Sequence, residues 1–146
     1  MKRLIINIFI LVIIGCETKI NKQVIATNKA PKAIGPYSQG IKVNNTLYLA
    51  GQIALDPTTG EMVKGGIEDQ TQQVIKNLEA VLKEAGFELY DVVQTQIFLS
   101  DLNHYQAMND VYSKYFNNSP PARAVVEAAR LPRDALIEMM LVAKKP

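Results

Sequence analysis

Residues 67–86 read IEDQTQQVIKNLEAVLKEAG, and they carry a sustained apolar pattern. Apolar or small side chains recur there about once per helical turn, at Ile67, Thr71, Val74, Ile75, Leu78, Val81, Leu82 and Ala85. This spacing predicts an amphipathic α-helix with one buried face, and Gly86 is typical of the residue that ends such a helix.

Short strand patterns lie on both sides of this helix. Before it, residues 41–43 and 46–50 predict two strands around a tight turn at Asn44-Asn45, because asparagine tolerates the left-handed backbone of hairpin turns. After it, residues 92–99 alternate valine, threonine, isoleucine and leucine with glutamines, which is typical of a strand.

A second helix and a final hairpin complete the order of elements. Ser100-Asp101 is a typical N-terminal cap. The helix after it carries one stripe that we interpret as ordinary core, formed by Leu102, Tyr105, Met108, Tyr112 and Tyr115. Residues 124–130 and 136–143 predict a hairpin across the loop 131–134.

The resulting order, ββαβαββ, predicts an α+β fold in two layers. One sheet would carry both helices on one face, and its other face would need cover. A second subunit is one way to supply that cover.

The N-terminus resembles an export signal. A basic pair at residues 2–3 precedes a mostly aliphatic run at residues 4–14, far shorter than the roughly 20 residues that span a bilayer. The segment IIGC at 13–16 resembles the bacterial lipobox, whose cysteine is lipidated and becomes the first residue of the mature protein. The resemblance implies lipid on Cys16 and, because Glu17 rather than aspartate follows, retention at the outer membrane.

We therefore expect a signal peptide at residues 1–15, a lipidated tether at 16–23 and one folded domain at 24–146. The protein would be an exported lipoprotein on the periplasmic side, in contact with the membrane only through its N-terminal lipid. The alternatives are an uncleaved short anchor and a cytoplasmic protein. An internal start does not produce a complete cytoplasmic form, because the next methionine, Met62, lies inside the predicted domain.

Charge and residue counts exclude several classes of site. Loss of residues 1–15 removes Lys2 and Arg3, so 14 basic residues would balance 14 acidic ones, which gives no electrostatic case for nucleic-acid binding. Cys16 is the single cysteine and His104 the single histidine. No zinc constellation, serine-triad elbow or phosphate-binding glycine loop is present in the sequence, so we expect neither metal nor cofactor.

Arg123 is the main candidate for ligand binding. The segment PPAR at residues 120–123 places it at the mouth of a small, apolar strand. A guanidinium fork on a rigid element suits bidentate capture of a carboxylate. The alternative, which this segment alone leaves open, is a structural ion pair with Glu127 or Glu138.

Several motifs together resemble the RidA family of enamine/imine deaminases. They are APKAIGPYSQG at residues 30–40, AGQI at 50–53, DLN at 101–103, and PAR at 121–123 followed by LPRDA at 131–135. The resemblance spans residues 24–144 in the right order and spacing. It implies a chorismate-mutase-like fold, assembled as a homotrimer around a central barrel with pockets at the subunit interfaces.

The resemblance also implies roles for individual residues. Arg123 would grip the substrate carboxylate, and Glu138 would position or deprotonate the attacking water. The substrate-binding residues would be Tyr37, Ala50, Gly51, Asn109, Arg123 and Val125. A symmetric final hairpin would put Glu138 opposite Glu127, on the same face as Arg123.

Three positions depart from common members of the family. Ala50 stands where a serine often precedes the Gly-Gln pair, which removes one hydroxyl contact. Val125 replaces a frequent cysteine, whose backbone carbonyl is the group that the family uses. Met140 replaces a second glutamate, which changes the polarity of the pocket or the packing of the barrel.

The implied reaction is hydrolysis of a 2-imino acid, or its enamine tautomer, to a 2-keto acid and ammonia without a cofactor. One alternative is a non-catalytic small-carboxylate-binding or stress-related protein. Another alternative is a ribonuclease or translation inhibitor. The neutral charge of the mature chain and the absence of an acid-base histidine near Arg123 argue against it. The usual imines arise from cytoplasmic pyridoxal-phosphate enzymes, so the expected export leaves the source of substrate open.

Overall fold

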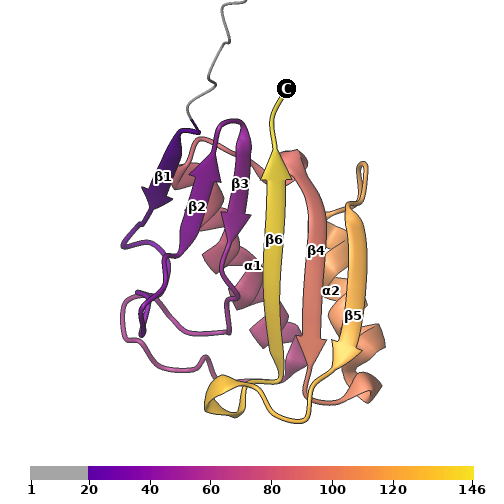
Figure 1. Cartoon of the computed structure of the whole chain (residues 1–146). Coiled ribbons are helices and arrows are strands. Elements are labelled where there is room, and N and C mark those ends of the chain that lie inside the picture. The colour runs from indigo at the N-terminus through magenta and orange to yellow at the C-terminus, as the bar shows by residue number, and fades with distance from the viewer. Residues whose placement is uncertain (1–19) are drawn as a thin grey trace, which may run out of the picture.

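A computed structural model describes residues 20–146 of the chain (Figure 1). The expected signal peptide and the lipidation site Cys16 lie outside these residues. None of the helices within residues 20–146 has the length and apolar character needed to cross a bilayer.

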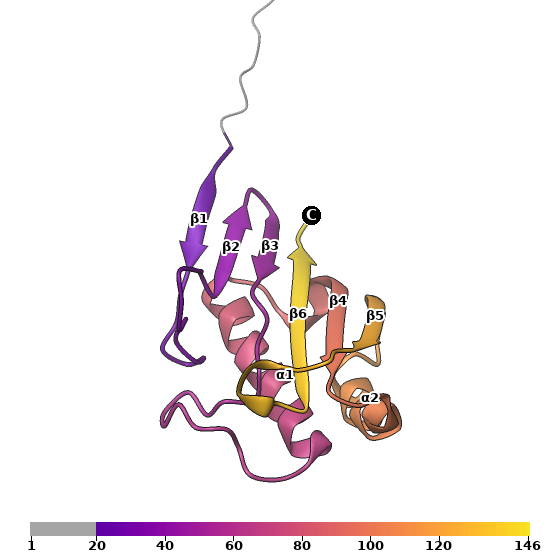
Figure 2. The ribbon, with the colours of Figure 1, turned by 60° about the horizontal axis from the view of Figure 1, so that its bottom comes forward.

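The described chain forms one six-stranded sheet and two α-helices (Figures 1 and 2). The elements are β1 (Lys22–Ile25), β2 (Gly40–Val43), β3 (Thr46–Leu49), α1 (Ile67–Glu84), β4 (Val92–Leu99), α2 (Tyr105–Tyr115), β5 (Ala122–Glu127) and β6 (Ile137–Lys144), with 3₁₀ turns η1 (Leu89–Asp91), η2 (Leu102–His104) and η3 (Pro132–Asp134). The strand order is β1-β2-β3-β6-β4-β5, and β4 and β5 are the parallel pair.

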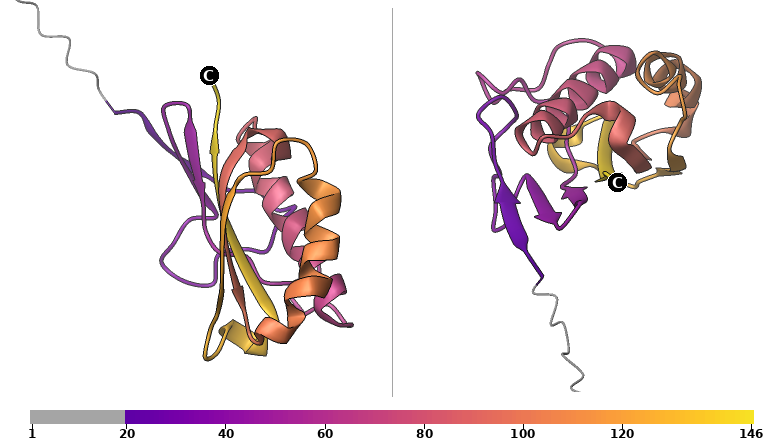
Figure 3. Two further views of the ribbon diagram at one scale, coloured as in Figure 1. Left: turned by 90° about the vertical axis from the view of Figure 1, so that its right-hand side faces the viewer. Right: turned by 90° about the horizontal axis from the view of Figure 1, so that it is seen from above.

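Both helices cover the same face of the sheet (Figure 3, left), so the predicted two-layer α+β fold is confirmed. Helix α1 buries the predicted stripe, with Val74, Leu78 and Leu82 fully covered by the sheet. The helix ends where glycine permits it, because Gly86 takes a φ of 77°. The turn between β2 and β3 is also as predicted, with Asn44 at a φ of 54°.

The sheet begins earlier than the sequence suggested. Strand β1 starts at Lys22 and pairs antiparallel with β2, so Lys22 and Gln23, which we had expected in the tether, belong to the sheet.

The predicted final hairpin is wrong. Strand β5 pairs in parallel with β4, and β6 runs antiparallel between β3 and β4. Strand β6 suits a central position because Met139 and Leu141 pack toward the helices while Met140 and Val142 are also apolar on the other face. The loop from β5 to β6 therefore crosses the end of β4 instead of joining neighbouring strands.

The stripe on the second helix is only partly core. Met108 and Tyr112 are buried, whereas Leu102 and Tyr105 are 46% and 40% exposed. Leu102 lies in η2 and Tyr105 is the first residue of α2, so the exposed part of the stripe is its N-terminal end.

The sheet face opposite the helices is mostly apolar and largely uncovered, although β4 adds Gln94 and Gln96 to it. Val24, Tyr48 and Val126 are 62%, 51% and 46% exposed there. In the strand register they lie alongside other apolar residues of the same face, Ile41, Val142, Phe98 and Ala124. An apolar face of this kind on a folded domain is typical of an interface.

Candidate functional site

The expected site residues form two groups on opposite faces of the sheet. Arg123 is in register with Thr95, which is fully buried beneath the helices. Glu138 is in register with Phe98, three residues further along β4. Because successive side chains of a strand alternate between faces, Arg123 and Glu138 point to opposite sides. The expectation that they share a face is wrong, and its cause is the insertion of β4 between β5 and β6.

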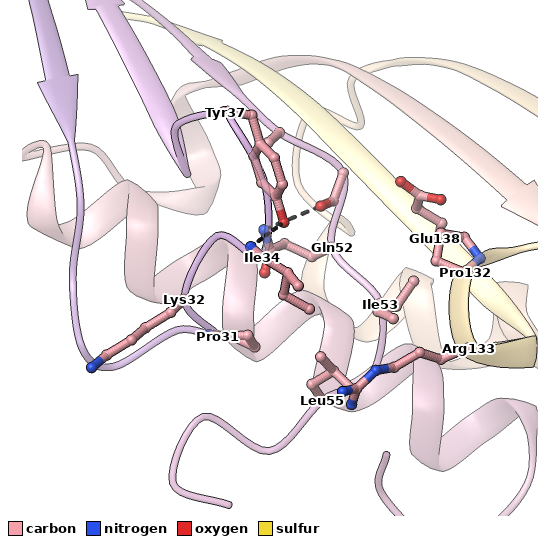
Figure 4. A pocket seen from close by; sticks show the side chains of 12 residues that line it. Pro31, Lys32, Ile34, Tyr37, Gln52, Ile53, Leu55, Pro132, Arg133 and Glu138 are labelled. Atoms are coloured by element: carbon pink, nitrogen blue, oxygen red, sulfur yellow. Dashed lines mark hydrogen bonds between the residues drawn. The ribbon is translucent and has the colours of Figure 1, made fainter. Parts of the chain in front are cut away.

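The first group lines a cavity of about 580 Å³ beside β6 (Figure 4). Four expected residues meet here: Tyr37, Ala50, Gly51 and Glu138. The remaining lining is mostly apolar, with two cations and an amide, and consists of Pro31, Lys32, Ile34, Gln52, Ile53, Leu55, Pro132 and Arg133.

Gly51 allows the Glu138 carboxylate to lie against the backbone. A Cβ built at position 51 would overlap the carboxylate oxygen of Glu138. The two segments are fixed by a backbone bridge, in which the Gln52 N–H donates to the Met139 carbonyl at 2.9 Å and the Met139 N–H donates to the Gln52 carbonyl at 3.1 Å. Any side chain at position 51 would therefore displace the carboxylate.

Burial raises the pKa of Glu138 above the usual glutamate range, because the apolar surroundings disfavour its charged form. A carboxylate with a raised pKa is a better proton acceptor near neutral pH than an ordinary glutamate.

A buried glutamine holds the opposite wall of the cavity. The Gln39 amide donates to the Pro31 carbonyl at 2.7 Å and to the Thr27 carbonyl at 3.0 Å, and its oxygen accepts from the Thr27 N–H at 2.6 Å. The same loop ends at Tyr37, whose hydroxyl accepts from the Ile34 N–H at 3.3 Å. The sequence pattern did not point to Gln39, although it stands two residues after Tyr37 in the motif at residues 30–40.

Two polar residues of α1 form hydrogen bonds with segments that line or adjoin the cavity. Buried Asn77 donates to the Leu55 carbonyl at 2.9 Å, and the Gln70 side chain accepts from the Leu136 N–H at 2.9 Å. Both interrupt the apolar face of the helix, and that interruption was the signal that could have found them.

The second group surrounds Arg123. Its Nη1 donates to the Asn109 side-chain oxygen at 2.9 Å, and its Nη2 donates to the Tyr105 hydroxyl at 3.1 Å. The guanidinium carbon lies 4.6 Å from the centre of the Tyr112 ring, within cation–π range. Residues 105, 109 and 112 share one side of α2 because they are four and three positions apart. A cavity of about 410 Å³ opens beside Asn109, Tyr112 and Arg123.

The structural ion pair that was the alternative role for Arg123 is not present. Within residues 20–146, the salt bridges do not include Arg123. Glu127 instead accepts from the Leu102 N–H at 2.9 Å, at the turn before α2. The guanidinium is therefore oriented by neutral groups and keeps its full charge for a ligand.

Tyr112 is itself fixed by packing. Its hydroxyl lies 3.1 Å from that of Thr95, its ring stacks on Phe116 at 4.4 Å, and burial raises the pKa of its hydroxyl. Val125, also expected at the site, lies two residues beyond Arg123 and packs against the core, and it lines neither cavity.

Over residues 20–146, no three histidine, cysteine or acidic side chains gather closely enough to hold a metal ion. What the two groups offer is an oriented guanidinium for an anion and a carboxylate of raised pKa beside a mostly apolar cavity.

Comparison with known proteins gives consistent similarities. The family model described as Endoribonuclease L-PSP matches residues 27–145. A RutC family protein of Pyrococcus abyssi is 58% identical over 124 residues, 85% of this chain and 98% of the relative. The 2-iminobutanoate/2-iminopropanoate deaminase of Mus musculus is 44% identical over 126 residues, 86% of this chain and 93% of the relative. The crystal structure of E. coli TdcF with bound serine has a TM-score of 0.82 at 34% identity, covering 85% of this chain and 99% of that chain.

Proposed function

Because this chain belongs to the endoribonuclease L-PSP family, which includes RutC family proteins and RidA-type deaminases, we propose that it hydrolyses 2-imino acids, or their enamine tautomers, to 2-keto acids and ammonia. The name of the mouse relative supports this substrate class, and the serine in the TdcF structure supports a ligand built on an amino-acid skeleton.

The observation that carries the proposal is the setting of Arg123. Its guanidinium is held by Asn109 and Tyr105 and is not neutralised by an acid within the described residues. A planar cation fixed in this way is suited to bind a carboxylate through two parallel hydrogen bonds.

We further propose that the complete site forms between subunits of a homotrimer. Arg123 and Glu138 of one chain point to opposite faces of the sheet, so a site that uses both takes them from different subunits. The exposed apolar face with Val24, Tyr48 and Val126 supplies a surface for such an assembly.

In this site the protein holds and orients the reactants. Arg123 binds the carboxylate, and Glu138 accepts a proton from the water whose oxygen adds to the imine carbon. The nitrogen takes up protons, and the C–N bond then breaks with its electron pair leaving as ammonia, so that imine and water give ketone and ammonia. The imine carbon is already electrophilic, and catalysis rests mainly on positioning and proton transfer.

The second candidate is a small-carboxylate-binding protein without turnover. Ala50 favours it, because this cavity residue has no hydroxyl to offer a substrate. The deciding experiment incubates purified protein with imines released by an amino-acid oxidase and follows their loss. Accelerated hydrolysis supports the deaminase. Binding of 2-keto acids without acceleration supports the second candidate, and RNA cleavage by the same preparation would replace both.

For the N-terminus we propose a signal peptide at residues 1–15 and a lipid on Cys16, on the sequence pattern alone. Fatty-acid labelling in a bacterial host should mark the wild type but not Cys16→Ser. Equal amounts of unlabelled protein from both would instead favour a cytoplasmic location.

A further inference from the structure

Arg133 is an unexpected cation in the wall of the Glu138 cavity. It lies in η3 with a φ of 56°, and the next residue, Asp134, has a φ of 54°. Two consecutive left-handed residues without a glycine are strained, and such strain persists where the surrounding structure determines the conformation. The conformation carries the Arg133 side chain along the cavity, toward Leu55 in Figure 4.

A hydrogen bond from a distant loop fixes the guanidinium there. Its Nη1 donates to the Gly60 carbonyl at 2.7 Å. This bond occupies one of the five N–H donors of an arginine side chain and leaves its charge uncompensated, because a carbonyl is neutral.

The nearest acid in the sequence is already engaged. Asp134 accepts a hydrogen bond from the Arg130 Nε at 2.8 Å, and these two residues form a salt bridge. Among the described residues, no salt bridge reaches Arg133. Arg133 is thus an exposed cation without an acidic partner at the wall of a cavity whose neighbouring walls are apolar, formed by Ile53, Leu55 and Pro132.

The position of Arg133 relative to Glu138 defines a second end of the cavity. In Figure 4, Glu138 extends from β6 on one side of Ile53 and the Arg133 side chain runs on the other, whereas Lys32 extends away from both. The cavity, about 580 Å³, is much larger than a small imino acid needs, and pockets of about 300 to 1,000 Å³ hold drug-sized ligands. A substrate whose reacting carbon lies at Glu138 would extend its side chain toward Arg133.

We propose that Arg133 forms a second anion-binding subsite, so that the site prefers 2-imino acids with another carboxylate at the end of the side chain. The inference rests on the proposed function, in which Arg123 of the partner subunit holds the first carboxylate. The apolar wall between the two ends suits the methylene groups that join two carboxylates, and a guanidinium fork suits the terminal carboxylate.

The test compares two ligands that differ chiefly in the terminal carboxylate, 2-oxoglutarate and 2-oxopentanoate. Binding of each to the full chain is measured by calorimetry, and hydrolysis is measured for the imines that an oxidase forms from glutamate and norvaline. We expect 2-oxoglutarate to bind the wild type about tenfold or more tightly than 2-oxopentanoate, as one charge-assisted hydrogen-bonded contact allows.

Arg133→Gln should abolish this preference and leave binding of 2-oxopentanoate unchanged, and Arg133→Lys should restore part of it. Lys32→Gln is the matched control, because Lys32 is also a cation in the wall of this cavity but extends away from Arg133 and Glu138 (Figure 4), and it should keep the preference. If Arg133 had only a structural role through its contact with Gly60, Arg133→Gln would instead lower the thermal midpoint and weaken the binding of both ligands equally.

The subsite proposal would be overturned if the wild type bound both ligands with equal affinity, or if Arg133→Gln lowered the affinity for both ligands equally. Failure of the proposed function has a different signature, since neither imine would be hydrolysed. The calorimetric comparison would then still decide whether Arg133 recognises the terminal carboxylate.

Discussion

Replacing Arg123 by lysine keeps the charge of the carboxylate-binding group and removes its geometry. In the structure, Nη1 and Nη2 are each held by a neutral acceptor, Asn109 at 2.9 Å and Tyr105 at 3.1 Å. A single ammonium group cannot keep both contacts and also present two parallel donors to a carboxylate. The substitution therefore removes at least one charge-assisted hydrogen bond from the bound state.

Such a bond is worth about 1.5 to 3 kcal/mol, which corresponds to a loss of about 10- to 150-fold in kcat/KM. The assay follows the disappearance of an oxidase-generated imine at several substrate concentrations, and circular dichroism and thermal unfolding verify the fold. Arg130→Lys is the control, because Arg130 forms an exposed pair with Asp134 and neither residue lines either site cavity. A folded Arg123→Lys protein with kcat/KM unchanged would refute carboxylate capture by Arg123.

Three further substitutions test the rest of the site. Glu138→Gln should lower kcat about 10²- to 10⁴-fold if the carboxylate is the base. Because burial raises the pKa of Glu138, the wild-type rate should fall on acidification at a higher pH than that at which an ordinary glutamate titrates, and the rate of the variant should not show this fall. Because the pKa of Glu138 is raised in the folded state, its ionised carboxylate destabilises the fold above that pKa, so Glu138→Gln should raise the thermal midpoint at neutral pH more than in acid. Equal shifts of the midpoint at neutral and acidic pH would contradict the effect of burial. Tyr105→Phe removes the hydroxyl that accepts from Nη2 and should raise KM several-fold with little change in the thermal midpoint, whereas an unchanged KM would show that Asn109 and Tyr112 suffice to orient Arg123. Gly51→Ala should displace the Glu138 carboxylate and lower kcat. Gly86→Ala, at the end of α1, is the control, because its added Cβ meets no neighbour although its φ of 77° makes the substitution strained; equal kcat values for Gly51→Ala and the wild type would show that the carboxylate can shift without cost.

Individual helices and strands could be predicted well from the sequence, because each has a hydrophobic pattern within its own short segment. The stripe on residues 67–85 is buried in α1 apart from a partly exposed Ala85, and the alternation at 92–99 corresponds to β4. Strand pairing is not local. The last two strands looked like a hairpin because they are adjacent in sequence, but β6 gains more by lying between β3 and β4, where its apolar residues are used on both faces.

The candidate site was predictable as a set of residues and not as a geometry. Motif resemblance identified Tyr37, Gly51 and Glu138, which the fold gathers at one cavity, and Arg123 with Asn109, which it gathers at another. That these groups lie on opposite faces follows from the position of β4, which no motif encodes. The positioning role of Tyr105 was hidden because a tyrosine on a helical stripe is usually core.

The central claim is that Arg123 and Glu138 act together from different subunits. Mixing two variants, Arg123→Ala and Glu138→Gln, tests it most directly once light scattering has established the assembly state of each. When the two are unfolded together in equal amounts and refolded, a site shared between neighbouring subunits of a closed ring should be intact in about a quarter of cases. The mixture should then recover about a quarter of the wild-type imine hydrolysis, although each variant alone is nearly inactive. A mixed assembly with no more activity than the separate variants would contradict the claim.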